Sequence, residues 1–350
     1  MRKLRILKYL SAYSVPATVA VAFTHTGGWS YLPLLYSFAF IPFMELLIGG
    51  NPRNLQGLDK ELTARDPGYD YLLFAVVPLQ YAFLGWFVLS MQQPGISTFT
   101  EVGRITSLGM LCGVMGINVA HELGHRRQRF PQIMAKALLL TSLYPHFYIE
   151  HNYGHHRNVG TPHDPATARF GEPLYLFWWR SVTGAYRHAW QIQKQLLKAG
   201  KRSFWSIKND MLWYEVLKML LLLAIYLLGG WWVLLGYVGA AIIGILLLET
   251  VNYIEHYGLK RQKVSAYRYE NTQPQHSWNS DHYVGRMVLF ELTRHSDHHA
   301  HPHKKYQVLD HFDQSPQLPT GYPGMMLLSA IPPLWFRVMN KRCAVPQLTP

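Results

Sequence analysis

The stretch that decides the fold is GRITSLGMLCGVMGINVAHELGHRR, residues 103–127, in which an apolar run leads directly into two histidines. The run at 103–123 is long enough to cross the hydrocarbon core of a bilayer, which takes about 20 mostly apolar residues. His121 and His125 are four residues apart, so on a helix both imidazoles share one face and reach the same metal region. The stretch therefore predicts a membrane helix with metal-binding side chains at its end.

Other apolar stretches extend this prediction to an all-α integral membrane protein with six transmembrane helices. The chain of 350 residues is 49% hydrophobic and 15% charged, whereas a typical soluble domain carries about 25% charged residues. Gly229 and Gly230 lie between the last two stretches and predict a tight turn between antiparallel helices. The predicted spans are 9–26, 29–49, 70–91, 103–123, 210–228 and 231–252. Two shorter apolar stretches, 131–149 and 320–338, are expected to lie at the interface or inside the polar part instead.

The positive charges predict the orientation of these spans. Short loops at 27–28, 92–102 and 229–230 hold no Lys or Arg, whereas the N-terminus holds four: Arg2, Lys3, Arg5 and Lys8. By the positive-inside rule both termini lie in the cytoplasm. A net charge of +13 is also common among nucleic-acid-binding proteins, but its uneven distribution favours membrane topology and no nucleic acid is expected.

The remaining polar residues are expected to form a histidine-rich helical cap on the cytoplasmic side. The cap comprises 124–209 and 257–350, and with the spans it makes one domain over 1–350 of a protein in the bacterial inner membrane. The basic start of the chain resembles a signal peptide, but no convincing cleavage site follows it.

Four motifs place histidines on the same predicted side of the membrane. Besides HELGH they are EHNYGHH at 150–156, NYIEH at 252–256 and RHSDHH at 294–299. Together they supply nine of the 18 histidines: His121, His125, His151, His155, His156, His256, His295, His298 and His299. Nine imidazoles suit two metals with open positions. Imidazole binds zinc, copper, iron and nickel, and the spacing alone does not choose among them.

Other cofactor motifs are absent from the sequence. Cys112 and Cys343 are far apart and form no CxxC pair, so the chain has no thiolate zinc site, iron–sulfur cluster or rubredoxin-like iron site of its own. It also lacks the glycine-rich fingerprints that bind dinucleotides or phosphates. Nothing in the sequence would hold a nicotinamide or a flavin.

The motifs resemble those of bacterial alkane 1-monooxygenases, within the membrane fatty-acid desaturase and hydroxylase superfamily. The resemblance rests on HELGHR (121–126), EHNYGHHRNVGTPHDP (150–165), NYIEHYGL (252–259) and RHSDHHAHP (294–302), with HSWNS (276–280) and LPTGYPG (318–324) beside them. It covers most of 70–340. Thr293, Gly160 and His163 depart from the usual pattern, which puts fine tuning rather than reaction class in doubt.

The resemblance implies a non-haem diiron centre with the nine histidines as its ligands. It implies terminal hydroxylation of n-alkanes to primary alcohols with O2, using electrons from rubredoxin and its NADH-dependent reductase. Four carboxylates beside the ligands are expected to orient the imidazoles or to form salt bridges with nearby arginines: Glu150, Glu255, Asp164 and Asp297. An apolar channel for the substrate is expected along Ser37, Phe38, Phe40, Phe87 and Leu246, residues that also suit plain helix packing.

Three alternatives fit parts of the same pattern. A fatty-acid desaturase or a xylene-type aromatic-methyl monooxygenase would use the same irons. An intramembrane zinc protease would use HExxH, but it would leave most of the clustered histidines unexplained. A metal transporter would need polar residues along the spans, whereas the histidines gather at one end.

Overall fold

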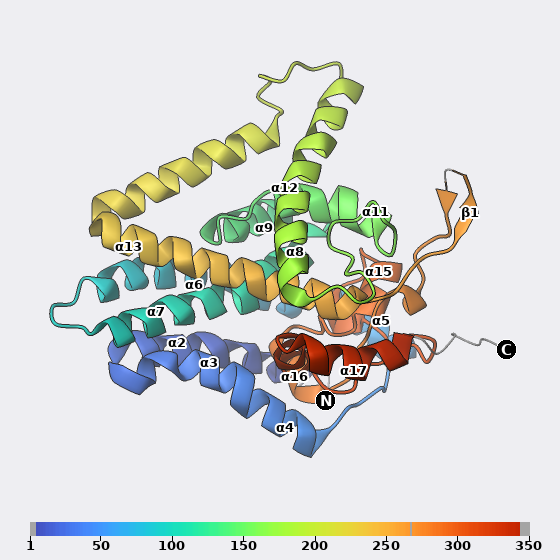
Figure 1. The fold of residues 1–350 in the computed structure, drawn as a ribbon, viewed down its shortest axis with the longest axis horizontal. Helices are drawn as coiled ribbons and strands as arrows, with labels where there is room; N and C mark the ends of the chain where they lie inside the picture. The colour runs from blue at the N-terminus through green and yellow to red at the C-terminus, as the bar shows by residue number, and fades with distance from the viewer. Residues whose placement is uncertain (1–4, 267, 344–350) are drawn as a thin grey trace.

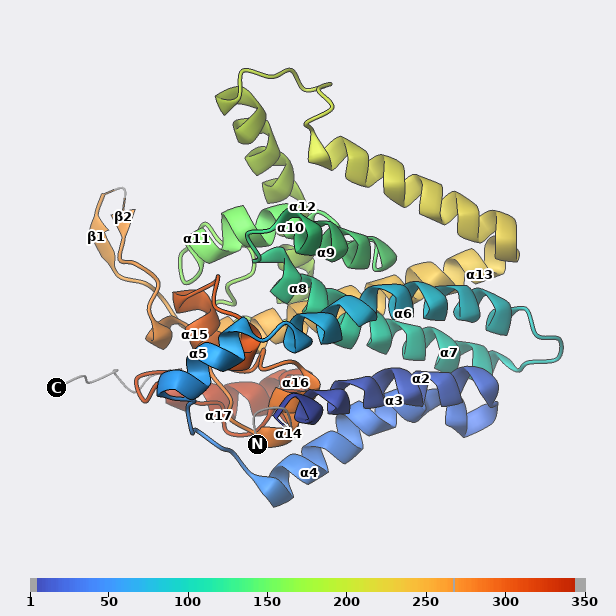
Figure 2. The same cartoon turned by 180° about the vertical axis from the view of Figure 1, so that it is seen from behind.

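The computed structural model describes residues 5–266 and 268–343, which are mostly helical. Long helices lie side by side, and short helices, loops and a small hairpin gather at one end of them (Figures 1 and 2). The α-helices are α2 (Ser14–Thr24), α3 (Leu32–Leu35), α4 (Ile41–Ile48), α5 (Gly57–Arg65), α6 (Gly68–Met91), α7 (Thr98–Leu111), α8 (Asn118–Gly124), α9 (Arg129–Thr141), α10 (Phe147–Ile149), α11 (His156–Asn158), α12 (Leu174–Ala199), α13 (Asp210–His256), α14 (Tyr283–Val288), α15 (His295–Ala300), α16 (Tyr322–Ser329) and α17 (Pro332–Cys343).

Shorter elements complete the described chain. The 3₁₀ segments are η1 (Ile6–Tyr13), η2 (Gly27–Tyr31), η6 (Pro274–His276) and η7 (Tyr306–Val308), and the π-helical segments are η3 (Tyr36–Phe40), η4 (Cys112–Ile117) and η5 (Glu150–His155). Strands β1 (Lys263–Ser265) and β2 (Arg268–Tyr269) pair antiparallel. Arg2 and Lys3, two of the four basic residues that predict a cytoplasmic N-terminus, lie outside the described residues.

Five helical stretches in the described chain are long and apolar enough to cross a membrane. They are Ile6–Thr24, Gly27–Ile48, Gly57–Met91, Thr98–Gly124 and Asp210–His256. The first four contain most of the four spans predicted up to residue 123. The stretches at 131–149 and 320–338 form α9, α16 and α17, which are not among the five. The predicted all-α fold with long apolar helices is therefore confirmed, and five of these helices in the described residues are suited to cross a membrane.

The fifth stretch covers both of the last two predicted spans, and the helix is interrupted between them as Gly229 and Gly230 predict. Helix α13 runs for 47 residues, and only Gly230 inside it departs from helical geometry, with φ 74° and ψ −175°. A left-handed φ costs glycine little because it has no Cβ. Figures 1 and 2 show the consequence, because the two arms of α13 meet at a sharp bend. A straight helix of this length would span about 70 Å, more than twice the hydrocarbon core of about 30 Å.

Charged residues in the apolar helices have partners. Lys218 pairs with Glu215 at 2.8 Å within α13. Arg104 of α7 is fully buried, and its guanidinium donates to the carbonyl of Ser90 at 2.5 Å and to Oε1 of Gln93 at 2.9 Å. Arg104 therefore ties α7 to the C-terminal end of α6, where backbone carbonyls lack helical partners.

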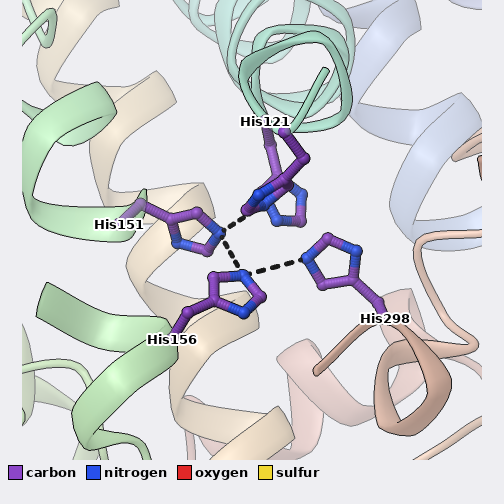
Figure 3. Close-up of side chains that lie close together, drawn as sticks. His121, His151, His156 and His298 are labelled. Carbon is purple, nitrogen blue, oxygen red and sulfur yellow. Dashed lines mark hydrogen bonds between the residues drawn. The ribbon is translucent and has the colours of Figure 1, made fainter. Parts of the chain in front are cut away.

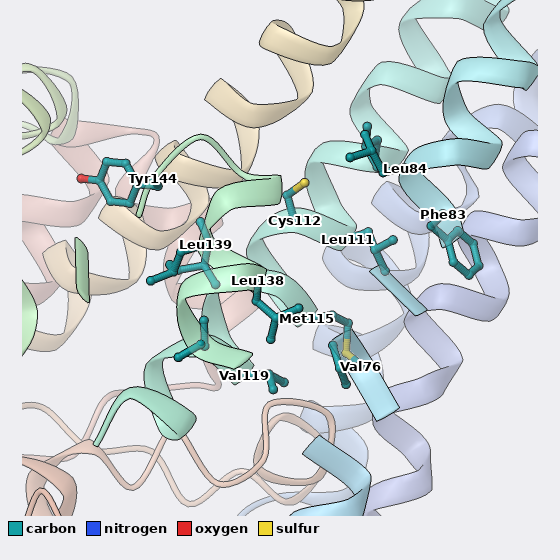
Figure 4. Close-up of a cluster of buried hydrophobic side chains, with 14 of the residues drawn as sticks. Val76, Phe83, Leu84, Leu111, Cys112, Met115, Val119, Leu138, Leu139 and Tyr144 are labelled. Carbon is teal, nitrogen blue, oxygen red and sulfur yellow. The ribbon is translucent and has the colours of Figure 1, made fainter. Parts of the chain in front are cut away.

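Small residues let α7 and α13 pack closely, which helps to place His121 on α8 and His256 at the end of α13. A Cβ on Gly109 would lie 2.6 Å from Ile243, and one on Gly244 would lie 2.7 Å from Cys112. Glycines at such contacts let membrane helices approach closely. Figure 4 shows the apolar packing around Cys112 and Met115, which continues through α9 as far as Tyr144. This close packing brings the ends of α8 and α13 to one place.

Candidate metal centre

The structure brings all nine predicted histidines together in two groups. In each group one possible ligand atom per residue lies within 4.8 Å of the corresponding atom of every other member. The first group has five members, His121, His125, His151, His156 and His298, and the second has four, His155, His256, His295 and His299. A metal about 2.1 Å from each nitrogen would place opposite ligands about 4.2 Å apart. Both groups therefore have the dimensions of a metal site.

Helical spacing explains which histidines share a group in two of the motifs. On α8, His121 and His125 are four residues apart and both belong to the first group, as their spacing predicts. On α15, His295 and His299 are also four apart and share the second group, whereas His298 belongs to the first. One short helix thus supplies both groups.

The EHNYGHH motif divides differently because it is π-helical. In η5 the backbone N–H of His156 donates to the carbonyl of His151, five residues earlier. A π turn therefore aligns residues five apart instead of four. His151 and His156 accordingly share the first group, with their Nε2 atoms 3.0 Å apart, and His155 joins the second. His256, the last residue of α13, completes the second group beside His155.

The ring nitrogens within each group point toward one another. Figure 3 shows the rings of His121, His151, His156 and His298 gathered together, with His298 facing His156. Nε2–Nε2 separations are 3.1 Å for His125–His151 and 3.2 Å for His156–His298. In the second group they are 3.2 Å for His155–His299 and for His295–His256.

This donor set fits a bound cation. A neutral imidazole has one N–H and one lone pair, so several buried imidazoles facing one another cannot all donate. Nε2 of His121 is buried without a hydrogen-bond partner among the described residues, and an unpaired buried polar atom is costly. A metal ion would accept these lone pairs.

Burial also keeps the imidazoles neutral, as metal ligation requires. It lowers the pKa of His151 and His298 well below the usual range, and neighbouring histidines lower both further. His155 differs. Burial lowers the pKa of this imidazole, but the carboxylates of Asp164, Glu150 and Glu249 together outweigh burial, so the pKa is raised.

Similarity to known proteins agrees with this geometry. A family model described as fatty acid desaturase matches residues 102–327, which hold all nine histidines. The chain is 40% identical over 344 residues to alkane 1-monooxygenase from Pseudomonas putida, covering 92% of this chain and 81% of the relative. A second relative, alkane 1-monooxygenase 1 from Alcanivorax borkumensis, is also 40% identical, with 92% and 80% covered.

The chain belongs to the alkane 1-monooxygenase family. The resemblance found in the motifs is thereby confirmed. A more distant relative, the xylene/toluene monooxygenase hydroxylase component from Pseudomonas putida, is 28% identical over 344 residues, covering 95% of this chain and 88% of the relative.

Two of the four predicted carboxylates contact the histidine groups of this family member. Nδ1 of His155 donates to Oδ2 of Asp164 at 2.9 Å, which leaves Nε2 facing the second group. Oε2 of Glu255 lies 3.1 Å from Nε2 of His295, the nitrogen that also faces His256. Glu255 therefore lies on the side of the His295 ring that faces the other histidines. A carboxylate that only orients the ring would bind the opposite nitrogen, Nδ1.

The other two carboxylates contact different partners. Asp297 pairs with His301 at 2.7 Å and with Lys304, and Glu150 accepts from Nδ1 of His188 at 3.1 Å. Both therefore make ionic contacts with side chains outside the nine predicted ligands, and a role for them in orienting the imidazoles stays a prediction. Adjacency in sequence does not by itself bring a carboxylate to an imidazole, because neighbouring helical side chains point about 100° apart.

An apolar cavity reaches both histidine groups from the helices. Its volume is about 70 Å³, and its mostly apolar lining is typical of small-molecule sites. His121, His151 and His295 line its inner end, and Ser37 and Phe38 line it as predicted. The rest of the lining comes largely from α7, η4 and α13 and includes Met110, Gly113, Val114, Leu247, Leu248 and Val251.

Three of the predicted channel residues do not line this cavity. Phe40 is 50% exposed on the outside of the helix, and Phe87 packs against Phe23 in the core. Leu246 does not line the cavity, whereas the next two residues, Leu247 and Leu248, do. Tyr322, which was not predicted from the sequence, lines the cavity and donates to Oε1 of Glu255 at 2.7 Å. The LPTGYPG stretch at 318–324, which contains Tyr322 and belongs to the resemblance, could have indicated this residue.

Proposed function

We propose that this chain hydroxylates the terminal carbon of n-alkanes to primary alcohols with O2, at a centre of two irons. The observation that carries the proposal is an apolar cavity ending at two histidine groups in a chain 40% identical to alkane 1-monooxygenases. Each group would hold one iron, the first through five imidazoles and the second through four. When bound, the irons would supply the activation of O2 for attack on an unactivated C–H bond.

The protein's own residues would position the substrate and exclude water. An alkane has no polar handle, so only apolar contacts hold it, each buried CH2 contributing about 0.8 kcal/mol. Phe38 and Val114 lie along the cavity and His121 at its end, which would present one end of the chain to the irons. Asp164 would fix the tautomer of His155 and so keep Nε2 free for the metal.

The membrane arrangement is part of the proposal. Because α13 bends back at Gly230, it would cross the bilayer twice and bring the number of crossings to six. We propose one domain over 1–350 in the bacterial inner membrane, with both termini and the cap of 124–209 and 257–350 in the cytoplasm. Basic residues dominate the polar segments, in agreement with the positive-inside rule.

Two electrons per turnover would come from rubredoxin, reduced by its NADH-dependent reductase. The chain has no CxxC pair and no dinucleotide fingerprint, so a separate electron donor is required. A small acidic protein would be attracted to the basic cytoplasmic surface.

Two related reactions compete with alkane hydroxylation. This chain is 28% identical to the xylene/toluene relative and 40% identical to an alkane 1-monooxygenase. The higher identity favours alkane hydroxylation. A desaturase would leave an alkene in an acyl chain.

Metal content and product identity test the proposal together. The protein is purified in detergent, its metals are counted, and rubredoxin, its reductase, NADH and n-octane are supplied. Two irons per chain and 1-octanol are expected. Two irons with no oxidation of octane would move the assignment to a desaturase or an aromatic-methyl hydroxylase, and one zinc per chain would refute the diiron centre.

A further inference from the structure

A row of aromatic rings leads away from the metal-binding histidines, and the proposed hydroxylation does not use it. Phe147 stacks on His151 with ring centroids 4.7 Å apart and planes 25° apart. Tyr144 stacks on Phe147 at 5.9 Å and 24°. Tyr144 is therefore separated by one ring from a candidate metal ligand.

The row continues from Tyr144 toward the outside of the protein. The Tyr144 and His146 rings are 4.4 Å apart, and the His146 and Tyr186 rings are 5.1 Å apart. His146 is buried, and neither of its ring nitrogens has a hydrogen-bond partner among the described residues. Tyr186 lies half-buried on α12. Since electron tunnelling weakens steeply with distance, a row of rings in near contact is a favourable route for it.

Both tyrosines in the row donate to a carboxylate. The hydroxyl of Tyr144 donates to Oε1 of Glu249 at 2.9 Å, and that of Tyr186 donates to Oε1 of Glu215 at 3.2 Å. A tyrosine that loses an electron becomes a strong acid, so its oxidation needs a nearby base. Burial raises the pKa of Tyr144 well above its usual value, and Glu249 raises it further, so the phenol keeps its proton until an electron leaves.

The carboxylate beside Tyr144 is itself held in place. Oε2 of Glu249 accepts from the hydroxyl of Ser181 at 2.5 Å and from Nδ2 of Asn252 at 3.3 Å. These bonds leave Oε1 directed at the phenol. The arrangement is that of a fixed proton acceptor.

Beyond Tyr186 the aromatic residues reach the surface. Trp190 lies one helical turn further along α12, on the same face, and stacks on Phe204 at 5.8 Å. Phe204 contacts Trp205 at 5.1 Å, and Trp205 is 80% exposed. A reductant outside the protein can therefore approach the outer end of the row.

We propose that this row carries electrons inward to the metal centre when oxidising equivalents form there without substrate, and so protects the ligands from oxidation. The proposal rests on the proposed metal centre. Tyr144 would give an electron through Phe147 and its phenolic proton to Glu249. Tyr186 would then reduce the Tyr144 radical through His146, passing its own proton to Glu215 while Glu249 returns the first. A one-electron reductant in solution, such as ascorbate, would restore Tyr186.

The test uses iron-loaded protein and hydrogen peroxide, without alkane or rubredoxin. The iron is first oxidised to the ferric state, so that the two electrons and two protons that turn peroxide into two waters come from the side chains, and no other oxidant is needed. Radicals are followed by freeze-quench electron paramagnetic resonance, and oxidised side chains by mass spectrometry. Tyr144→Phe keeps the ring and removes the hydroxyl. Tyr237→Phe is the matched control, because Tyr237 is also buried but donates to the carbonyl of Thr141 at 2.9 Å and lies outside the row.

In the wild type we expect a tyrosyl radical that ascorbate removes. Tyr144→Phe should lose most of this signal and show several-fold more oxidation of His151 and Phe147, while Tyr237→Phe behaves as the wild type. An unchanged signal in Tyr144→Phe, equal losses in both variants, or no tyrosyl signal in the wild type would each overturn the proposal. Formation of 1-octanol is assayed separately, so that failure of hydroxylation with the radical intact refutes only the proposed function.

Discussion

Replacing Asp164 by asparagine tests how the second histidine group is organised. Asp164 is buried, and its Oδ2 accepts from Nδ1 of His155 at 2.9 Å and from the hydroxyl of Thr167 at 2.5 Å. Asparagine has the same shape but lacks the charge that holds the imidazole N–H. Removing such a partner of a metal-binding histidine typically reduces metal affinity about 10–100-fold, which corresponds to roughly 1.4–2.7 kcal/mol.

The assay is a competition for ferrous iron between the protein in detergent and a coloured chelator. Asp310→Asn serves as the control, because Asp310 is also buried in the polar part of the protein but pairs with Lys304 at 2.6 Å and with Lys60. We expect Asp164→Asn to release one iron per chain at a lower chelator concentration and Asp310→Asn to retain both. Thermal unfolding of the iron-free proteins separates binding from folding. Iron affinity unchanged by Asp164→Asn would refute the role given to the carboxylate.

Three further predictions concern the ligands, the cavity and the membrane helices. Alanine at His298 or at His155 should abolish hydroxylation and lower bound iron, since each removes a member of a different group; normal turnover by either purified variant would contradict the ligand assignment. Ser37→Phe should fill part of the cavity and shift product formation from long to short alkanes, by about fourfold for each CH2 excluded; chromatography of products from an alkane mixture would show it, and an unchanged distribution would remove Ser37 from the channel. Arg104→Ala should lower the thermal unfolding temperature in detergent, because each lost hydrogen bond to a buried charge costs about 1.5–3 kcal/mol, while iron content in the folded fraction stays the same; equal unfolding temperatures would show that Arg104 does not hold the ends of α6 and α7 together.

Helical spacing predicted from sequence that His121 and His125 reach the same metal region. They do share a group, and His295 and His299 share the other for the same reason, although that pair was not predicted. The same reasoning would pair His151 with His155, which is wrong. Local π-helical geometry in η5 pairs His151 with His156 instead, and no residue in EHNYGHH signals a π turn.

The cavity was harder to predict than the ligands. A membrane helix is apolar all round, so composition does not distinguish its lipid-facing side from its inner side. Phe40 and Phe38 are two residues apart on the same element, yet Phe40 is 50% exposed and Phe38 lines the cavity. Gly229 and Gly230 predicted a turn in α13, but the sequence did not indicate that Gly230 alone would depart from helical geometry. These features depend on contacts between elements distant in sequence.

The ionic partners of the carboxylates were likewise set by tertiary contacts. Asp164 faces His155 as its position near the motif suggested, whereas Asp297, inside a motif, contacts Lys304 and His301. Proximity in sequence predicted a contact correctly for Asp164, because the loop after His155 folds back and places the Asp164 carboxylate beside the His155 ring.

Mössbauer spectroscopy of the protein loaded with ⁵⁷Fe tests most directly whether the two histidine groups bind two irons. The groups differ in size, with five and four imidazoles, and Glu255 lies beside the smaller one. We expect two irons per chain in two distinguishable environments of equal population. A single iron environment at one iron per chain, or a protein that binds no iron, would contradict it.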